Sequence, residues 1–472
     1  MYELYILTEA RKYVTLSDNQ FGGEKGVSAV HFLTSVWEDI TANLEDHRAG
    51  VILTAVDYSK AFNRLEHLPC LTTLASLGLP NQLLQIITSF LTSRTMTVRV
   101  GEAASLPRPV NAGAPQGSVL GSFLFNAGIN DLEEGFCDTI RETPPEAPET
   151  NPTTASATST PAKPSSNPFL NAPGSPILGG RTVEILPSAV NVPASLRKMP
   201  KWRNEPIKVV KYIDDGVIIE KLNFHELPLL EQEDVRFKYA HASRSEDMFK
   251  HVSERARGRG MVVNDSKTSV LCVSDPLSIQ QNAYIRAGTE DIKGGESLKI
   301  LGFTFNREPT VNAHVAGVTS RLRSRTWALR KLRRAGFTSE ELLKFYKAAI
   351  RPVAEYLSPV FHSMTPTYLS DDLERQQVLA LKNIYGVDKS ANKLRSEANV
   401  ETLSARREQA VLKFATTASR SGRFSGWFPR RPGERRVRGM RPFLEKTPRT
   451  ERYRRAPLNY MKKVLNDAAT DT

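Results

Sequence analysis

The chain has 472 residues, more than one compact domain usually contains, and this length indicates about three domains. Hydrophobic residues make up 40% and charged residues 24% of the sequence, which excludes a wholly disordered protein. Lys and Arg number 64 against 51 Asp and Glu, a net charge of +13, and the stretch 420–463 alone carries 15 basic and 3 acidic residues, or 15 − 3 = +12. This excess excludes an acidic, calcium-buffering protein and favours a polyanionic partner.

The cysteines and the apolar segments indicate the compartment. Cys70, Cys137 and Cys272 are far apart, so they form neither a disulfide framework nor a cysteine-rich zinc site, and they suit a reducing environment. No apolar run reaches the roughly 18 residues of a membrane span, and the first residues do not resemble a secretory signal. We therefore expect an intracellular chain without a membrane partner, with a nuclear or nucleocytoplasmic location favoured.

Strand-like and helix-like patterns alternate over residues 1–135. The apolar, β-branched run 50–56 predicts a buried strand, and 59–65 continues with helical spacing. Apolar residues at helical intervals follow the start signal Leu79-Pro80-Asn81 and predict a further helix there.

The composition changes sharply after Asp138. Residues 143–176 contain nine Pro and three charges, with Phe169 and Leu170 as the large apolar residues. Such a segment cannot bury enough surface to offset its ordering entropy, so we expect 139–205 to be a disordered insertion. Because strand-like alternation resumes over 207–219, the insertion is expected to interrupt one domain rather than separate two.

From Arg321 the pattern is helical and strongly basic. Residues 321–351 hold ten basic and two acidic residues, and the predicted apolar anchors are Trp327, Leu329, Leu332, Leu342, Leu343 and Tyr346. Ser370-Asp371-Asp372 predicts the start of an amphipathic helix over 373–385. These helices suit contact with nucleic-acid phosphates, and a solvated helix face is the simpler alternative.

The tail beyond Ser419 is rich in arginine and interrupted by proline, so we expect it to be poorly ordered without a partner. Its arginines alternate with four aromatic residues, Phe424, Trp427, Phe428 and Phe443. This mixture suits contact with a nucleic-acid backbone and stacking on bases. A nuclear-import signal or simple solubility explains it equally well.

Three features of the first domain carry chemistry together. Asp57 stands at the exit of the apolar strand, Gly113 to Ser118 reads GAPQGS before a helix-like stretch, and Asp214-Asp215 occupies a tight turn between two strand-like runs. A single Asp after a strand is usually a turn or helix cap, and a GAPQGS-type turn can simply start a helix. Two adjacent carboxylates at a hairpin, however, repel each other unless a cation neutralises them. With Asp57 they would form an oxygen-rich site suited to Mg²⁺, and two such ions can activate a hydroxyl and stabilise a leaving pyrophosphate.

In this order, Asp57 with YSKAF, the GAPQGS turn and Tyr212-Ile213-Asp214-Asp215 resemble the A, B and C motifs of reverse transcriptases, those of non-LTR (LINE-type) retrotransposons above all. Gln20-Phe21-Gly22, residues 264–271 and residues 298–302 are similar to further segments of that family, and 346–359 and 373–386 to its thumb. The resemblance implies an α+β right-hand polymerase with a palm and partial fingers over 1–305, a helical thumb over 306–418 and the basic tail over 419–472. It also implies RNA-directed DNA polymerase activity on an RNA template and a DNA primer, with deoxynucleoside triphosphates as substrates.

The resemblance assigns roles to individual residues. Asp57, Asp214 and Asp215 would hold two Mg²⁺ ions, with Mn²⁺ able to substitute, and Lys267 would protonate the pyrophosphate. Phe62 would exclude a 2′-hydroxyl, although its residue type alone favours core packing. The remaining residues of the nucleotide and template pocket would be Pro115, Gln116, Gly117 and Tyr212.

Some features depart from the family pattern. The chain begins close to Gln20-Phe21-Gly22, so we expect an N-terminal truncation that removes most of the fingers, and Asn63 stands where the family often has Asp. Two alternatives follow. One is a catalytically inactive remnant that only binds nucleic acid, and the other is a different palm polymerase, either an intron-type reverse transcriptase or an RNA-dependent RNA polymerase.

Overall fold

The computed structural model describes residues 2–46, 49–136, 207–223, 244–274, 284–287, 290–431, 441–445 and 447–470. These residues belong to one compact unit that excludes 137–200. The predicted insertion over 139–205 and Cys137 lie outside the described residues. Cys70 and Cys272 are both buried.

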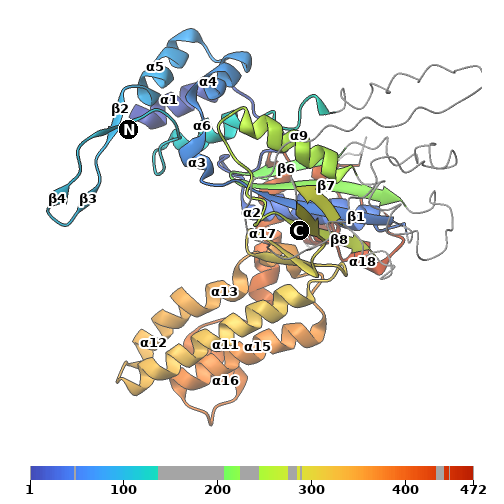
Figure 1. The fold of residues 1–472 in the computed structure, drawn as a ribbon. Helices are drawn as coiled ribbons and strands as arrows, with labels where there is room; N and C mark the ends of the chain where they lie inside the picture. The colour runs from blue at the N-terminus through green and yellow to red at the C-terminus, as the bar shows by residue number, and fades with distance from the viewer. Residues whose placement is uncertain are drawn as a thin grey trace, which may run out of the picture. The chain divides into compact units, whose positions relative to one another are not determined.

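A four-stranded antiparallel sheet forms the centre of this unit (Figure 1). Its order is β6 (Lys208–Tyr212), β7 (Asp215–Asn223), β1 (Ala49–Asp57) and β8 (Ser269–Ser274). The predicted strand over 50–56 is therefore confirmed as a central strand. Val51 and Leu53 of β1 belong to one hydrophobic cluster, while Ile52 and Val56 belong to another, as the two faces of a strand require.

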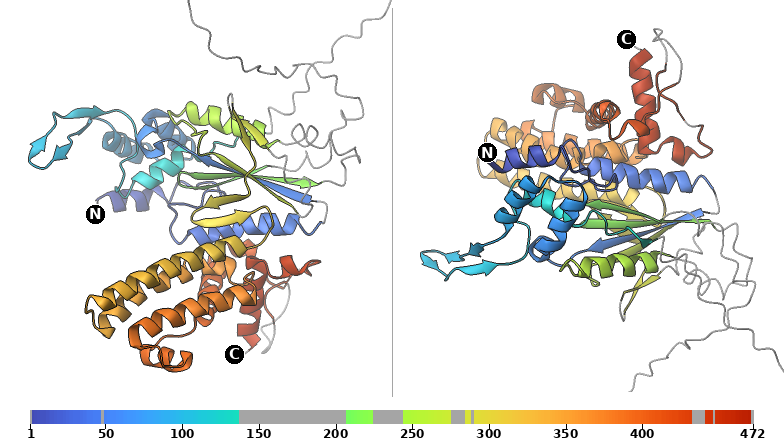
Figure 2. Two further views of the ribbon diagram at one scale, coloured as in Figure 1. Left: turned by 60° about the horizontal axis from the view of Figure 1, so that its bottom comes forward. Right: turned by 90° about the horizontal axis from the view of Figure 1, so that it is seen from above.

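Helices cover both faces of the sheet. Figure 2 shows α2 (Ala29–Asn43) on one side and α9 (Ser245–Arg257) on the other. The α2 helix contributes Phe32, Val36 and Trp37, all buried, to the cluster that contains Val51. The opposite face packs against α9 and α6 (Gly121–Gly128), so the sheet is buried on both sides.

The first 310 residues contain further described elements outside this sheet. They are α1 (Tyr2–Ala10), α3 (Ala61–Arg64), α4 (His67–Ser76), α5 (Asn81–Leu91), and four strand pairs, β2 (Arg94–Met96) with β5 (Arg108–Val110), β3 (Arg99–Val100) with β4 (Ala103–Ala104), β9 (Tyr284–Ala287) with β10 (Glu290–Lys293), and β11 (Ser297–Ile300) with β12 (Phe303–Asn306). The predicted helix start at Asn81 is confirmed.

Helices dominate from residue 312 onward. They are α11 (Asn312–Arg334), α12 (Ser339–Phe345), a π-helical turn (Tyr346–Ile350), α13 (Arg351–Glu355), α14 (Ser358–Phe361), α15 (Thr367–Tyr385), α16 (Ala391–Ala398) and α17 (Leu403–Arg420). Two sequence predictions are wrong in detail. The α15 helix begins at Thr367, before Ser370, and Trp327 is 57% exposed rather than an apolar anchor, because α11 buries Leu322 and Leu329 instead.

The described part of the C-terminal tail is folded, which corrects the prediction of a poorly ordered segment. It contains a 3₁₀ turn (Ser425–Trp427), α18 (Glu451–Arg454) and α19 (Pro457–Thr470), and α19 packs against α17 and α2. Phe424, Phe428 and Phe443 are each less than 10% exposed. These rings belong to the same hydrophobic cluster as Phe32 and Val51, and their burial removes them from the set available for base stacking.

Across the described residues, the structure contains no helix that combines the length and apolar character of a membrane span.

Candidate active site

The three predicted carboxylates come from neighbouring strand ends. Asp57 is the last residue of β1 and pairs with Asp215, the first residue of β7, across the antiparallel ladder. Asp214 precedes Asp215 in the turn that joins β6 to β7, where Tyr212 pairs with Asp215. Register alone therefore brings Asp57 opposite the Asp214-Asp215 pair, although 157 residues separate the two segments in the sequence.

The β6–β7 turn is tight and uses an uncommon backbone conformation. Ile213 has φ +58°, in the left-handed region, where a β-branched residue is an outlier. Two-residue hairpin turns favour glycine at such positions. Strain of this kind persists only where the surrounding structure enforces it, and it is concentrated at functional sites.

The charges at this sheet end are poorly neutralised. Burial, followed by the negative charges of Asp214 and Asp57, raises the pKa of Asp215 to about 6. Oδ2 of Asp57 is buried and accepts no hydrogen bond, and its nearest cation is the Lys267 ammonium, with Nζ at 3.6 Å. The site therefore concentrates negative charge that one exposed lysine only partly offsets.

These carboxylates fit a divalent cation by donor chemistry, because hard cations take carboxylate oxygens and the buried Asp57 oxygen accepts no hydrogen bond. Among the described residues, however, no three Asp, Glu, His or Cys side chains are already grouped as ligands. The Mg²⁺ assignment therefore stays a prediction.

Lys267 approaches Asp57 because the segment 262–267 is tied to the end of β1. The Ser59 amide donates to Val262 O at 2.8 Å, and the Asn264 amide donates to Asp57 O at 2.7 Å. The backbone of this segment thereby fixes where the lysine stem begins, while its ammonium stays largely exposed. The structure brings Lys267 to the predicted site, and its catalytic role stays a prediction.

The GAPQGS turn is joined to the segment that follows Asp57. The Ala114 amide donates to Phe62 O at 2.7 Å, and the Gly113 amide donates to Leu65 O at 2.8 Å. A Cβ on Gly113 would lie 2.9 Å from Phe62 O, so only glycine permits this approach. The first and second motifs therefore form one backbone-bonded unit.

The other pocket residues differ in exposure. Phe62 is half-buried and stacks on Phe125 of α6, with ring centroids 4.4 Å apart, so core packing accounts for part of its surface. Gln116 and Gly117 are exposed, and Gly117 has φ +83° with open space around it. Pro115 and Tyr212 are half-buried. Gln116 and part of Phe62 are therefore accessible to a ligand.

A buried lysine that sequence reasoning missed lies three residues before Asp214. Lys211 is 1% exposed, and its Nζ donates to Ile129 O at 3.0 Å and Asn130 O at 2.7 Å while forming an ion pair with Glu133. Burial lowers the pKa of Lys211, and Glu133 opposes the shift. The signal in the sequence was a lysine within the strand-like run Val209-Val210-Lys211-Tyr212, where its neighbours are expected to be buried.

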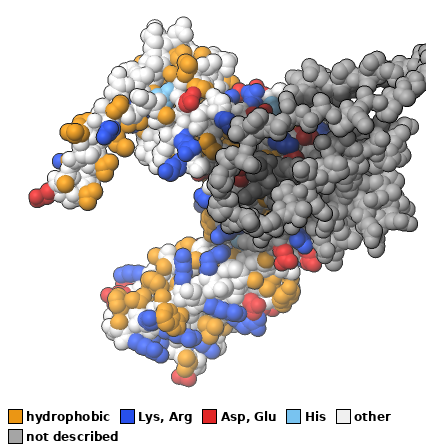
Figure 3. Space-filling model, viewed as in Figure 1, with side chains coloured by type: hydrophobic (Ala, Val, Ile, Leu, Met, Phe, Trp, Pro, Cys, Tyr) orange, Lys and Arg blue, Asp and Glu red, His pale blue; other side chains and the backbone are white. Residues whose placement is uncertain are grey.

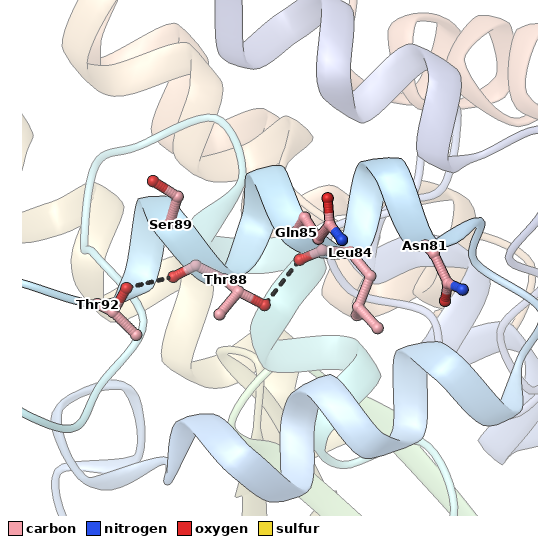
Figure 4. Close-up of a pocket in the computed structure, with 6 residues that line it drawn as sticks. All are labelled: Asn81, Leu84, Gln85, Thr88, Ser89 and Thr92. Atoms are coloured by element: carbon pink, nitrogen blue, oxygen red, sulfur yellow. Dashed lines mark hydrogen bonds between the residues drawn. The ribbon is translucent and has the colours of Figure 1, made fainter.

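Two other surfaces lie outside this site. An open hollow follows one face of α5 and contains none of the predicted site residues; Figure 4 shows its lining of Asn81, Leu84, Gln85, Thr88, Ser89 and Thr92. The helical region carries many basic side chains (Figure 3), and those exposed on α11 are Arg321, Arg323, Arg325, Arg330, Lys331, Arg333 and Arg334.

Comparisons with known sequences identify the kind of domain. Residues 5–143 match the family described as reverse transcriptase (RNA-dependent DNA polymerase). The chain is 33% identical over 127 residues to a probable RNA-directed DNA polymerase from transposon BS of Drosophila melanogaster. The aligned stretch covers 27% of this chain and 14% of that protein. The chain is 40% identical over 88 residues to the RNA-directed DNA polymerase from the mobile element jockey of the same organism, covering 19% and 9%.

The resemblance to reverse transcriptases is thus confirmed over residues 5–143, and both relatives are named as RNA-directed DNA polymerases of mobile elements. The chain spans less than a sixth of the length of either relative. Among solved structures, a telomerase from Candida albicans in complex with a telomeric RNA fragment aligns at TM-score 0.32 and 10% identity, over 89% of this chain and 53% of that one. Similarity at this level carries no argument about function.

Proposed function

We propose that this chain is the catalytic part of an RNA-directed DNA polymerase of a non-LTR retrotransposon. The observation that carries the proposal is the placement of Asp57 directly opposite Asp215, beside Asp214, at one end of a buried antiparallel sheet. The sequence match over 5–143 covers Asp57 and the GAPQGS turn, and the second half of the site comes from the strand register. The sheet with α2, α6 and α9 would be the palm, and α11 to α17 the thumb.

In this proposal the three carboxylates hold two divalent cations, and the cations, when bound, activate the primer 3′-hydroxyl and stabilise the leaving pyrophosphate. The negative charge at the site supports cation binding, because neighbouring ionised carboxylates repel one another and a bound cation would relieve that repulsion. Lys267, whose Nζ lies 3.6 Å from Asp57 Oδ2, would donate a proton to the leaving pyrophosphate.

The proposed substrate is a deoxynucleoside triphosphate that enters beside Phe62. The stack on Phe125 fixes the ring of Phe62, so the ring can act as a rigid barrier to a 2′-hydroxyl. Exposed Gln116 and Gly117 would contact the nucleotide or the template, and Tyr212 and Pro115 would complete the pocket wall. The backbone conformation explains why residue 117 is glycine, since Gly117 has φ +83°, which is strained for other residues.

An RNA template paired to a DNA primer is the proposed macromolecular substrate, held through phosphates by the exposed cations of α11. Seven exposed cations lie along this helix, and three of them, Arg325, Arg330 and Arg333, also donate to Ala349 O or to Asn383. Phosphate contacts position a duplex without regard to sequence, and affinity then falls steeply with salt.

Primer extension on an RNA template with Mg²⁺ tests the function. Wild type is compared with Asp214→Asn, and with Asp371→Asn as the matched control, because Asp371 belongs to another Asp-Asp pair and is exposed on α15. We expect extension by wild type and by the control, and loss of at least about 100-fold for Asp214→Asn. Equal extension by both variants would refute the assignment. Tight RNA binding without extension by wild type would favour an inactive remnant.

A further inference from the structure

We propose that Arg423, in the segment that follows α17, is a positioning residue for the Asp214–Asp215 hairpin. The inference rests on the proposed function in that it concerns the same site, and it extends that function to the C-terminal region, where the sequence indicated a nucleic-acid-binding tail. Arg423 acts through residues 17–22, which lie between it and strand β6.

The first contact joins the C-terminal segment to residues 17–20. The Arg423 guanidinium donates through Nη2 to Asp18 O at 2.9 Å and Gln20 O at 2.6 Å. Its carbon Cζ lies 5.5 Å from the centroid of the Phe21 ring and 5.6 Å from that of Phe424. One cation therefore bonds to two carbonyls of a loop and covers the aromatic ring that follows them, which fixes the loop at several points.

Aromatic packing holds Arg423 in place. Phe424 is 3% exposed and stacks on Phe21 and on His31 of α2, with centroids 6.2 and 4.4 Å apart. Trp427 lies 4.7 Å from Phe424. Because these rings anchor the segment after α17 to the sheet layer, the backbone that carries Arg423 has little freedom to move away.

The second contact joins residues 17–22 to the strand that leads to the catalytic pair. The Phe21 amide donates to Lys211 O at 2.7 Å, and the Lys211 amide donates to Asn19 O at 2.8 Å, so this loop extends the edge of the sheet beside β6. A Cβ on Gly22 would lie 2.5 Å from the amide nitrogen of Ile213. The loop backbone at Gly22 is thus in close contact with Ile213, the residue with positive φ next to Asp214.

A second set of hydrogen bonds, from α6, holds the same loop, so Arg423 is one of two groups that fix it. Gln20 Nε2 donates to Asn126 Oδ1 at 2.8 Å, and Asn126 Nδ2 donates to Gly22 O at 2.5 Å. Asn126 is fully buried in α6, and Gln20 is equally buried. Loss of Arg423 would leave the α6 contacts and free the outer side of the loop, so the hairpin would loosen without global unfolding.

Hydrogen exchange measured by mass spectrometry tests the inference on the full chain without substrate. The variant is Arg423→Ala, and Arg420→Ala is the matched control, since Arg420 is exposed three residues earlier. We expect amides over 209–217 to exchange about tenfold faster in Arg423→Ala, the effect of losing bonds to a charged donor. Amides of β8, at the other edge of the sheet, should keep their protection in both variants.

Each outcome decides the matter. Faster exchange confined to 209–217, restored in part by Arg423→Lys, supports the inference. Unchanged exchange there, or an equal loss in β8, overturns it, since an equal loss is a general stability effect. If Arg423→Ala does not fold, Arg423→Gln, which keeps amide donors, is measured against the same two segments. Primer extension by wild type and Asp214→Asn tests the proposed function independently, so failure of one is distinguishable from failure of the other.

Discussion

Replacing Lys211 by methionine should destabilise the chain through one buried anchor. The change removes the donor to Ile129 O and Asn130 O and leaves Glu133 without its cation. Breaking a buried ion pair costs about 3–5 kcal/mol, and the methionine stem recovers about 1 kcal/mol of apolar burial. The side chain of Glu133 is 18% exposed and regains some hydration, so we expect a net loss of about 3 kcal/mol in the free energy of unfolding.

The assay is urea unfolding at pH 7, with Lys208→Met as the control on the same strand. Lys208 pairs with Asp39 at 2.6 Å, but its side chain is 33% exposed, so its loss should cost less than about 1 kcal/mol. The double variant Lys211→Met with Glu133→Gln should lose less than the sum of the single losses, because the two residues share one interaction. Equal losses for Lys208 and Lys211 would refute the reasoning.

Three further outcomes are expected. Gly22→Ala should lower the free energy of unfolding, measured in urea, by about 1–3 kcal/mol, because its Cβ would lie 2.5 Å from a backbone nitrogen of the hairpin. Gly426→Ala, with open space around the added Cβ, should leave it unchanged, and equal losses in the two variants would contradict this. Burial lowers the pKa of His31 and of His314 from 6.5 to about 4. Between these pH values the unfolded chain binds protons that the folded chain does not, so the free energy of unfolding should fall as pH drops from about 6.5 toward 4. The expected loss at pH 5 is about 2 kcal/mol for each histidine. Urea unfolding at pH 7.5 and 5 measures this, and an unchanged loss in His314→Gln would count against the cause. Phe62→Val should raise ribonucleotide incorporation by about 10-fold or more in primer extension, and unchanged discrimination would return Phe62 to a packing role alone.

Sequence patterns predict where the three candidate carboxylates stand in the fold. Asp57 ends a run of β-branched residues, and Asp214-Asp215 lies between two alternating runs, so local patterns place both at strand ends. The structure adds the register that sets Asp57 against Asp215. That pairing depends on contacts between distant segments, which periodicity does not encode.

Predictions fail where long-range packing outweighs composition. The tail suggested disorder because it is rich in arginine and proline, yet Phe424 is buried against Phe21 and His31, more than 390 residues earlier in the chain. Trp327 was expected in the core, but the buried apolar residues of α11 are Val315, Val318, Leu322 and Leu329. The ring of Trp327 lies under the ammonium of Lys331 at 3.8 Å. Each error arises because a residue type fits two environments and only the fold decides between them.

Divalent cation binding to the carboxylates tests the central claim most directly. Mn²⁺ is titrated by electron paramagnetic resonance into wild type, Asp57→Asn and the control Asp371→Asn, at pH 7.5 and without nucleotide. The account predicts bound Mn²⁺ in wild type and in the control, and a loss of at least about tenfold in affinity for Asp57→Asn, because the buried Asp57 oxygen that accepts no hydrogen bond is then replaced by a neutral group. Equal Mn²⁺ affinity in all three proteins would contradict the assignment of this sheet end as a metal-dependent active site.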